Sequence, residues 1–217
     1  PRTTLFPYTT LFRSTETREK NYNDFQKMTF IILWIVGFCV TSLLCIYQPF
    51  MKVWVGEELM LSMSAVICFC VYFYITEINH LLSIYKDAAG LWHSDRFRPL
   101  ATAVINLILN VLLIQKIGIF GVLLSTIASY LLVGIPWLFY NIFTSMFDFK
   151  YFKPYLLQIM MYTGSIVLVS AITYGVCSLV NIGDWPNLIL RLVICAFIPN
   201  ALFMAIYHRS KYFIASV

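Results

Sequence analysis

The chain has 217 residues, and its composition excludes an ordinary water-soluble domain. Hydrophobic residues make up 60% of it and charged residues 12%, whereas soluble domains average roughly 45–50% and about 25%. The net charge of +5 does not indicate a nucleic-acid partner, because the basic residues are spread over short connecting segments and not gathered on one surface. The composition therefore predicts a membrane protein.

Residues 1–14 do not read as native protein sequence. They repeat Thr-Thr-Leu-Phe and lack both a helical period and the order of a signal peptide. The run from Thr4 to Ser14 resembles the translation of a sequencing-library adaptor, so we expect native sequence to begin near Thr15. Residues 15–217 are then expected to be a fragment of a longer protein. A short native tail is the alternative for residues 1–14.

Six apolar stretches follow, and each is long enough to cross a bilayer. A spanning helix needs about 20 apolar residues, because the hydrocarbon core is roughly 30 Å thick and each residue rises about 1.5 Å. Lipid offers no partner to an unpaired backbone group, and the stretches are too long for barrel strands. We predict an all-α, polytopic transmembrane bundle, with a tight turn at Gly118 between the third and fourth helices. The spans lie near 28–50, 59–84, 97–115, 117–142, 156–180 and 187–207.

The basic residues between the spans alternate from one side to the other. One side holds ten of them: Arg18, Lys20, Lys27, Lys86, Arg96, Arg98, Lys150, Lys153, Arg209 and Lys211. The other side holds Lys52 and Lys116. Because cytoplasmic loops carry the excess of Lys and Arg, both ends are predicted to lie in the cytoplasm. Arg191 falls inside the last span, where its side chain is expected to reach the outer interface.

Polar residues inside the second and third spans are candidates for a cavity wall. Glu77 and His80 are three residues apart and share a helical face, with Asn79 between them. A carboxylate at mid-bilayer costs about 2.5–3.5 kcal/mol, so it should face protein or water. These residues either bind a substrate headgroup or coupling cation, or make a structural hydrogen bond. Asn106 and Asn110, four apart, either line the same cavity or join neighbouring helices.

The fourth span carries small residues at helical spacing, and they predict close packing against another helix. These are Gly118, Gly121, Ser125 and Ser129. Pro136 and Pro199 interrupt the fourth and sixth spans and are hinge candidates, because a proline frees a carbonyl in the preceding turn.

The predicted inner loop 85–98 contains three cations, Lys86, Arg96 and Arg98. Guanidinium groups suit phosphate oxygens, so these residues are candidates for contacting a pyrophosphate headgroup at the cytoplasmic mouth. A purely topogenic role is the alternative.

No motif of covalent chemistry is present. The sequence has no Walker loop, nucleophile elbow or dinucleotide fingerprint. Its cysteines lie within the spans without CxxC spacing and are expected to be small apolar filler. They are Cys39, Cys45, Cys68, Cys70, Cys177 and Cys195. We therefore expect no enzyme activity, no cofactor and no metal site.

Several segments resemble the Wzx-type lipid-linked oligosaccharide flippases, a family in the superfamily that also contains multidrug and toxin extruders. The specific part of the likeness lies in 85–129, within a resemblance from about Thr15 to the C-terminus. It is carried by KDAAGLW (86–92), DRFRP (95–99), NLILN (106–110), KIGIFGV (116–122) and STIAS (125–129). QPFMKVWVG (48–56) is similar to the family's Pro-Phe-x-x-x-Trp-x-Gly signature.

The resemblance implies a protein of the bacterial plasma (inner) membrane that moves undecaprenyl-diphosphate-linked oligosaccharide units by alternating access, for capsule, O-antigen or exopolysaccharide synthesis. Family members have about twelve to fourteen spans in two lobes, so the resemblance implies that residues 15–217 are the C-terminal six-helix part of a two-lobe transporter. Missing N-terminal helices of the same protein are then a partner. A polysaccharide polymerase and glycosyltransferases are further implied partners. The family cavity is cationic, whereas this chain offers few cavity cations. The alternatives are a cation-coupled drug or metabolite antiporter of the same superfamily, a membrane-embedded glycosyl or acyl transferase, and a non-transporting assembly subunit.

Overall fold

The computed structural model describes residues 17–180 and 182–210, and the regular structure of this part of the chain is entirely helical. The adaptor-like residues 1–14 lie outside it. Six helical segments are long and apolar enough to cross a membrane, as the sequence predicted. They are Arg18–Trp54, Met63–Ala88, Trp92–Ile117, Ile119–Ser145, Phe149–Ser178 and Asp184–Tyr207.

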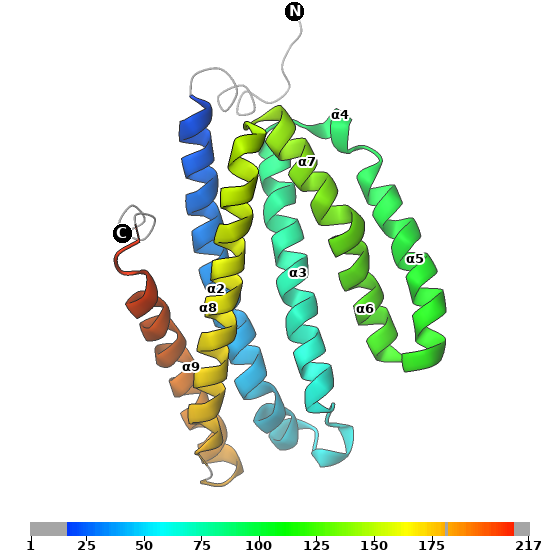
Figure 1. Cartoon of the computed structure of the whole chain (residues 1–217). Coiled ribbons are helices and arrows are strands. Elements are labelled where there is room, and N and C mark those ends of the chain that lie inside the picture. The colour runs from blue at the N-terminus through cyan, green and yellow to red at the C-terminus, as the bar shows by residue number, and fades with distance from the viewer. Residues whose placement is uncertain (1–16, 181, 211–217) are drawn as a thin grey trace, which may run out of the picture. The chain divides into compact units, whose positions relative to one another are not determined.

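Four of the helices are unbroken in the structure (Figure 1): α2 (Arg18–Trp54), α3 (Met63–Ala88), α8 (Phe152–Ser178) and α9 (Asp184–Tyr207). The third span combines α4 (Trp92–Asp95) and α5 (Arg98–Ile117). The fourth combines α6 (Ile119–Ser129), a π-helical turn η2 (Tyr130–Gly134) and α7 (Ile135–Ser145). Short 3-10 turns, η1 (Glu57–Leu59) and η3 (Phe149–Tyr151), precede α3 and α8.

The chain forms two compact units, and helices α2, α3 and α8 contribute to both. The first unit contains residues 17–29 and 75–157 of the described chain. The second contains 30–74 and 158–210, except the undescribed residue 181.

Aromatic side chains form the core of the first unit. The ring of Phe25, which is fully buried, lies with its centroid 4.4 Å from that of Tyr85, 4.6 Å from Tyr155 and 5.6 Å from Phe147. Phe143, on α7, packs against Phe147 and Tyr155. This core explains why α2 begins at Arg18 and not near residue 28, as hydropathy had predicted. The turns before residue 28 are held by aromatic packing, although they are too polar to register as a span.

Helices α5 and α6 form the predicted hairpin of the first unit (Figure 1). Gly118 makes the turn with φ +56° and ψ −130°, a conformation that favours glycine. A Cβ on Gly121 would lie 2.6 Å from the backbone carbonyl carbon of Leu113, so the two helices approach to backbone contact. Ser125 and Ser129 are fully buried on the same ridge. The predicted packing role is confirmed for Gly121, Ser125 and Ser129, whereas Gly118 serves the turn and has nothing within 4 Å of an added Cβ.

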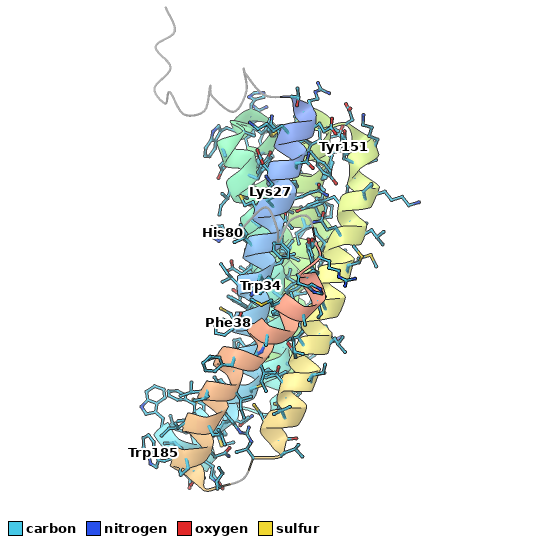
Figure 2. All side chains as sticks on the ribbon, turned by 90° about the vertical axis from the view of Figure 1, so that its left-hand side faces the viewer. Lys27, Trp34, Phe38, His80, Tyr151 and Trp185 are labelled. Carbon is cyan, nitrogen blue, oxygen red and sulfur yellow. The ribbon has the colours of Figure 1, made fainter. Side chains whose placement is uncertain are left out.

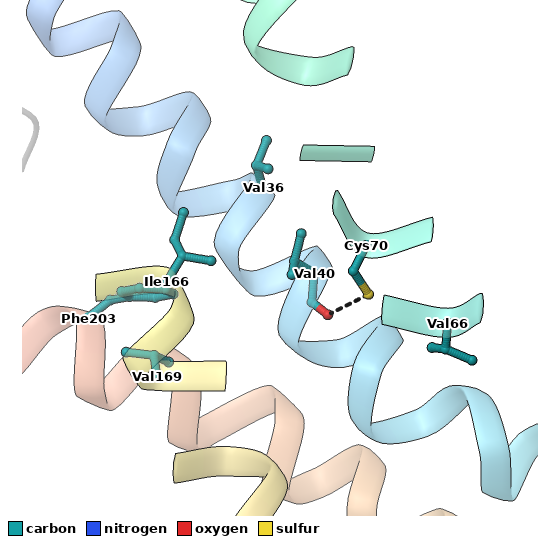
Figure 3. Close-up of a cluster of buried hydrophobic side chains, with 7 residues drawn as sticks. All are labelled: Val36, Val40, Val66, Cys70, Ile166, Val169 and Phe203. Carbon is teal, nitrogen blue, oxygen red and sulfur yellow. Dashed lines mark hydrogen bonds between the residues drawn. The ribbon is translucent and has the colours of Figure 1, made fainter. Parts of the chain in front are cut away.

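The second unit has an aliphatic core to which four helices contribute (Figure 3). The thiol of Cys70 on α3 donates to the backbone carbonyl oxygen of Val40 on α2 at 3.9 Å. Gly37 allows α2 to approach closely, since an added Cβ would lie 2.8 Å from side-chain atoms of both Ile166 and Phe203. The cluster comprises Val36, Val40, Val66, Cys70, Ile166, Val169 and Phe203.

Candidate amphipathic substrate site

A network of buried ion pairs joins the end of α3, the short helix α4 and the start of α5 in the first unit. Asp95, at the end of the short helix α4, is 4% exposed. Its carboxylate accepts from Lys86 Nζ at 2.8 Å, and from Nε and Nη2 of Arg98 at 2.7 and 3.0 Å. Asp87 is a second carboxylate partner of Lys86. The two cations and two carboxylates balance, so the network carries no net charge.

This network gives two of the three predicted headgroup cations partners within the protein. Lys86 and Arg98 are 4% and 8% exposed, and both face Asp95. Arg96 is exposed, with its guanidinium carbon 4.6 Å from the centroid of the Phe97 ring. Of the three, Arg96 is therefore the one that presents its charge at the surface.

Helix α7 holds the network in place through two side chains four residues apart. Trp137 Nε1 and Asn141 Nδ2 both donate to the backbone oxygen of Ser94, each at 3.3 Å. Asn141 Nδ2 also lies 3.5 Å from Asp95 Oδ1. The sequence had singled out neither Asp95 nor Asn141. Asp95 carried one signal, because it lies three residues before Arg98 and such pairs meet on a helix.

A polar seam runs along one face of α5, on side chains four residues apart: Thr102, Asn106 and Asn110. Asn106 Nδ2 donates to Thr126 Oγ1 on α6 at 3.2 Å, and Asn110 Nδ2 donates to Asn106 Oδ1 at 3.0 Å. The Ser125 hydroxyl on α6 also donates to Asn106 Oδ1, at 3.4 Å. Asn106 thus joins the two helices, and the seam defined by the three α5 residues faces α6.

The end of the seam nearest α3 has oxygen atoms without partners. Thr102 Oγ1 on the seam and Asn79 Oδ1 on α3 are buried and accept no hydrogen bond from any described residue. Asn110 Oδ1, at the opposite end of the seam, also lacks a described partner. A Cβ on Gly134 would lie 3.1 Å from Asn79 Oδ1 and 3.7 Å from Thr102 Oγ1. The absence of a side chain at Gly134 therefore lets the backbone of η2 approach Asn79 on α3 and Thr102 on α5 closely.

The π-helical turn η2 places Gly134 at this point. Ile135 N–H donates to Tyr130 O, the wider hydrogen bond of a π-helix. Pro136 follows directly and has no N–H to donate, so the carbonyls of this turn are under-supplied with donors. The proline predicted as a hinge is thus adjacent to an irregular turn; the hinge role itself stays a prediction.

An open, mainly apolar pocket of about 760 Å³ adjoins these residues in the first unit. Ala101 and Val133 in its wall neighbour Thr102 and Gly134 in the sequence. Ser94 and Asn141 also line the pocket, and the hydrogen bonds of Asn141 to Ser94 and Asp95 connect it to the ion network. The remaining wall is apolar or aromatic: Leu132, Pro136, Trp137 and Tyr140. An apolar wall with polar groups at its edge suits an amphipathic ligand.

Glu77 and His80 do not join the seam. Glu77 is partly exposed and His80 is exposed, and neither has a hydrogen bond or ion pair with a described residue. In Figure 2, His80 lies at the surface of α3. Asn79 is about 200° around the helix from Glu77, so the two side chains leave α3 on different faces. Of the three, only Asn79 is placed beside α5 and η2.

Asp148, in the segment between α7 and α8, shows how exposed charge pairs differ from the buried network. The hydrogen bond from Lys150 lowers the pKa of its carboxyl group, and Arg18 lowers it further. Arg18 Nη1 lies 2.9 Å from Asp148 Oδ1, and both side chains are well exposed. Water screens such pairs strongly, so they contribute little to stability.

Pro199, the other hinge candidate, is buried within an unbroken α9 in the second unit. Asn200 beside it donates to the backbone oxygen of Ala196 at 2.9 Å and accepts from Trp34 Nε1 at 3.0 Å. These contacts tie the turn around Pro199 to α2. The site residues predicted from sequence are therefore divided between the two units and do not form a single cluster.

Comparisons with protein-family models, curated proteins and solved structures give no match to this chain.

Proposed function

We propose that this multi-pass membrane protein transports undecaprenyl-diphosphate-linked oligosaccharides across a bacterial plasma membrane by alternating access, together with further helices of the same protein. The single observation that carries the proposal is the pocket of the first unit. It combines about 760 Å³ of mainly apolar wall with two polar residues, Ser94 and Asn141, that connect it to the ion network.

The parts of this region match the parts of such a substrate. The wall at Leu132, Pro136 and Tyr140 suits isoprenoid chain segments. Sugar hydroxyl groups would meet Ser94 and Asn141, the polar residues of the pocket wall. A diphosphate would meet the exposed guanidinium of Arg96, since the network neutralises Lys86 and Arg98.

The proposal is tested by filling the pocket. Ala101 lines it on α5, whereas Ala103 on the same helix is exposed outside it. The purified chain is reconstituted in vesicles with an undecaprenyl-diphosphate oligosaccharide that carries a photoreactive isoprenyl group, and the labelled peptides are sequenced. We expect the label on 132–141 and a loss of roughly tenfold in Ala101→Phe, which corresponds to about 1.4 kcal/mol of binding. Ala103→Phe should label like the parent.

Two results would contradict the proposal, provided that the variants keep the parent's helical content. One is equal labelling of Ala101→Phe and the parent. The other is labelling by undecaprenol without its diphosphate sugar that equals labelling by the complete lipid. Cation-dependent dye efflux without lipid binding would favour the antiporter, for which Glu77 is the supporting residue. It is a membrane carboxylate without an ion pair among the described residues.

A further inference from the structure

Three cysteines of the second unit come together although they are far apart in the sequence. Cys45 lies on α2, Cys177 in the last turn of α8 and Cys195 on α9. Their sulfur atoms all lie within 4.8 Å of one another, and each residue is at most 1% exposed. Ile46 and Ile194 pack against the group and shield it from water. The sequence predicted separate filler residues, because no spacing motif announces a cluster built from three helices.

We propose that Cys45, Cys177 and Cys195 bind one monovalent copper ion. Soft thiolate ligands select Cu(I). With metal–sulfur bonds of about 2.3 Å, three sulfurs around a trigonal ion are roughly 4 Å apart, close to the separation already present. Binding releases the proton of each thiol that becomes a thiolate and involves no change of oxidation state. A Zn²⁺ ion fits less well, because structural zinc takes four ligands and the described residues add no fourth His, Cys, Asp or Glu to the group.

A cationic side chain stands beside the cluster. Arg191 Nη1 donates to the backbone oxygen of Cys45 at 3.4 Å, and its Nε donates to Asn187 Oδ1 at 2.9 Å. Pro49 explains the first contact: it has no N–H, so the carbonyl four residues earlier, that of Cys45, lacks its helical donor. Three thiolates and one Cu⁺ carry two net negative charges, and the guanidinium offsets one of them.

The bound ion would connect α2, α8 and α9. Metal binding to the folded state alone stabilises that state, because the three ligands are assembled only there. This proposal involves the second unit and does not depend on the proposed transport function.

The test is an anaerobic titration of the purified full chain with Cu(I), supplied as its complex with a coloured competing chelator. We expect one copper per chain, with sulfur-only coordination by X-ray absorption. Cys177→Ser and Cys195→Ser should lose more than about tenfold in affinity, since each removes a ligand. Arg191→Gln should lose roughly tenfold, the size of a loss of supporting charge or hydrogen bonding around a metal. Cys70→Ser is the matched control, because Cys70 is a buried thiol outside the cluster.

Copper should also raise the midpoint of thermal unfolding of the parent and of Cys70→Ser, but not that of Cys195→Ser. The unmodified chain keeps the proposal falsifiable if a serine variant fails to fold. Absence of sulfur-coordinated copper in the parent would overturn the proposal. So would equal affinity of a folded Cys195→Ser variant, or tighter binding of Zn²⁺ than of Cu(I) by the parent.

Discussion

At the level of single side chains, the buried carboxylate of Asp95 is the most consequential charge in the first unit. It is 4% exposed and lies between Lys86 and Arg98, which are themselves buried. Asp95→Asn would leave two cations with one carboxylate partner, Asp87. We expect a loss of about 3–5 kcal/mol, the cost of breaking a buried ion pair by removing one partner. Chemical or thermal unfolding in detergent measures it.

Asp148→Asn is the control for this substitution. Asp148 also pairs with two cations, Arg18 and Lys150, but its side chain is 46% exposed. Its pKa is held below the ordinary value, so the small stabilisation it gives is present at neutral pH and is lost only as the pH falls through the pKa of the folded state. At neutral pH its removal should change unfolding far less than that of Asp95. Equal effects of the two substitutions would contradict the burial of the network.

The sequence identified the polar residues within the spans, but not the residues with which most of them interact. The stripe of Asn106 and Asn110 was readable because helical spacing alone puts both on one face. The assignment of Lys86 and Arg98 to a headgroup followed from their charge, but Asp95 reaches them only because the chain makes the short α4 turn. The contact of Asn79 with Gly134 depends on a π-helical turn that no local pattern announced.

At the level of helices, the surroundings of each glycine show whether two helices pack so closely that no side chain fits between them. A Cβ at Gly121 would meet backbone atoms of Leu113 and Ile114 at 2.6–2.7 Å, and backbone atoms have little freedom to move away. We expect Gly121→Ala to destabilise the α5–α6 hairpin by about 1–3 kcal/mol, the usual cost of overpacking. Unfolding of the purified variant in detergent is the measurement.

Gly164 supplies the matched control on α8, because nothing lies within 4 Å of its added Cβ. Gly164→Ala should be neutral or stabilising by about 0.5–1 kcal/mol, since alanine loses less conformational freedom in a helix. Gly37→Ala should fall between the two, because its neighbours are side-chain atoms of Ile166 and Phe203, which move more readily than backbone atoms. A Gly121→Ala variant as stable as Gly164→Ala would refute the close approach of α5 and α6.

The helices were predicted in number and order, but not in their ends. Hydropathy detects residues that leave water, whereas a helix continues for as long as its backbone bonds and its packing allow. Thus α2 reaches back to Arg18 on an aromatic core, and α4 lies before the predicted start of the third span. The π-turn η2 was hidden inside the fourth span, because its five residues are as apolar as their neighbours.

For the whole molecule, the exposed apolar surface of α5 requires a non-aqueous surrounding. Only 6% of the most apolar part of the span Trp92–Ile117 is buried within the protein. Large side chains on this helix are about half exposed or more: Val104, Leu107, Ile108, Val111, Leu112 and Ile114. Such a helix would draw molecules together in water, whereas lipid tails or further apolar helices satisfy it at no cost. This agrees with a chain that crosses the membrane several times.

The side of the membrane on which each loop lies follows from the predicted charge bias, and it can be tested with two engineered cysteines. Ser94 lies on α4, at the start of the third span, and Ile182 follows the fifth; both are exposed. Between them the chain crosses three times, through α5, α6–α7 and α8. An odd number of crossings places the two positions on opposite sides. With Lys86, Arg96 and Arg98 near Ser94, the positive-inside rule predicts that this residue lies in the cytoplasm.

In intact cells, an impermeant maleimide should therefore label Ile182→Cys and leave Ser94→Cys unlabelled until the membrane is permeabilised. The unmodified chain serves as the background, because its six cysteines all lie within helices long enough to span. Labelling of Ser94→Cys but not of Ile182→Cys in intact cells would contradict the predicted cytoplasmic location of both ends. It would still agree with six membrane crossings. Labelling of both positions from the same side is incompatible with three spans between them, since an odd number of crossings cannot return the chain to the side it left.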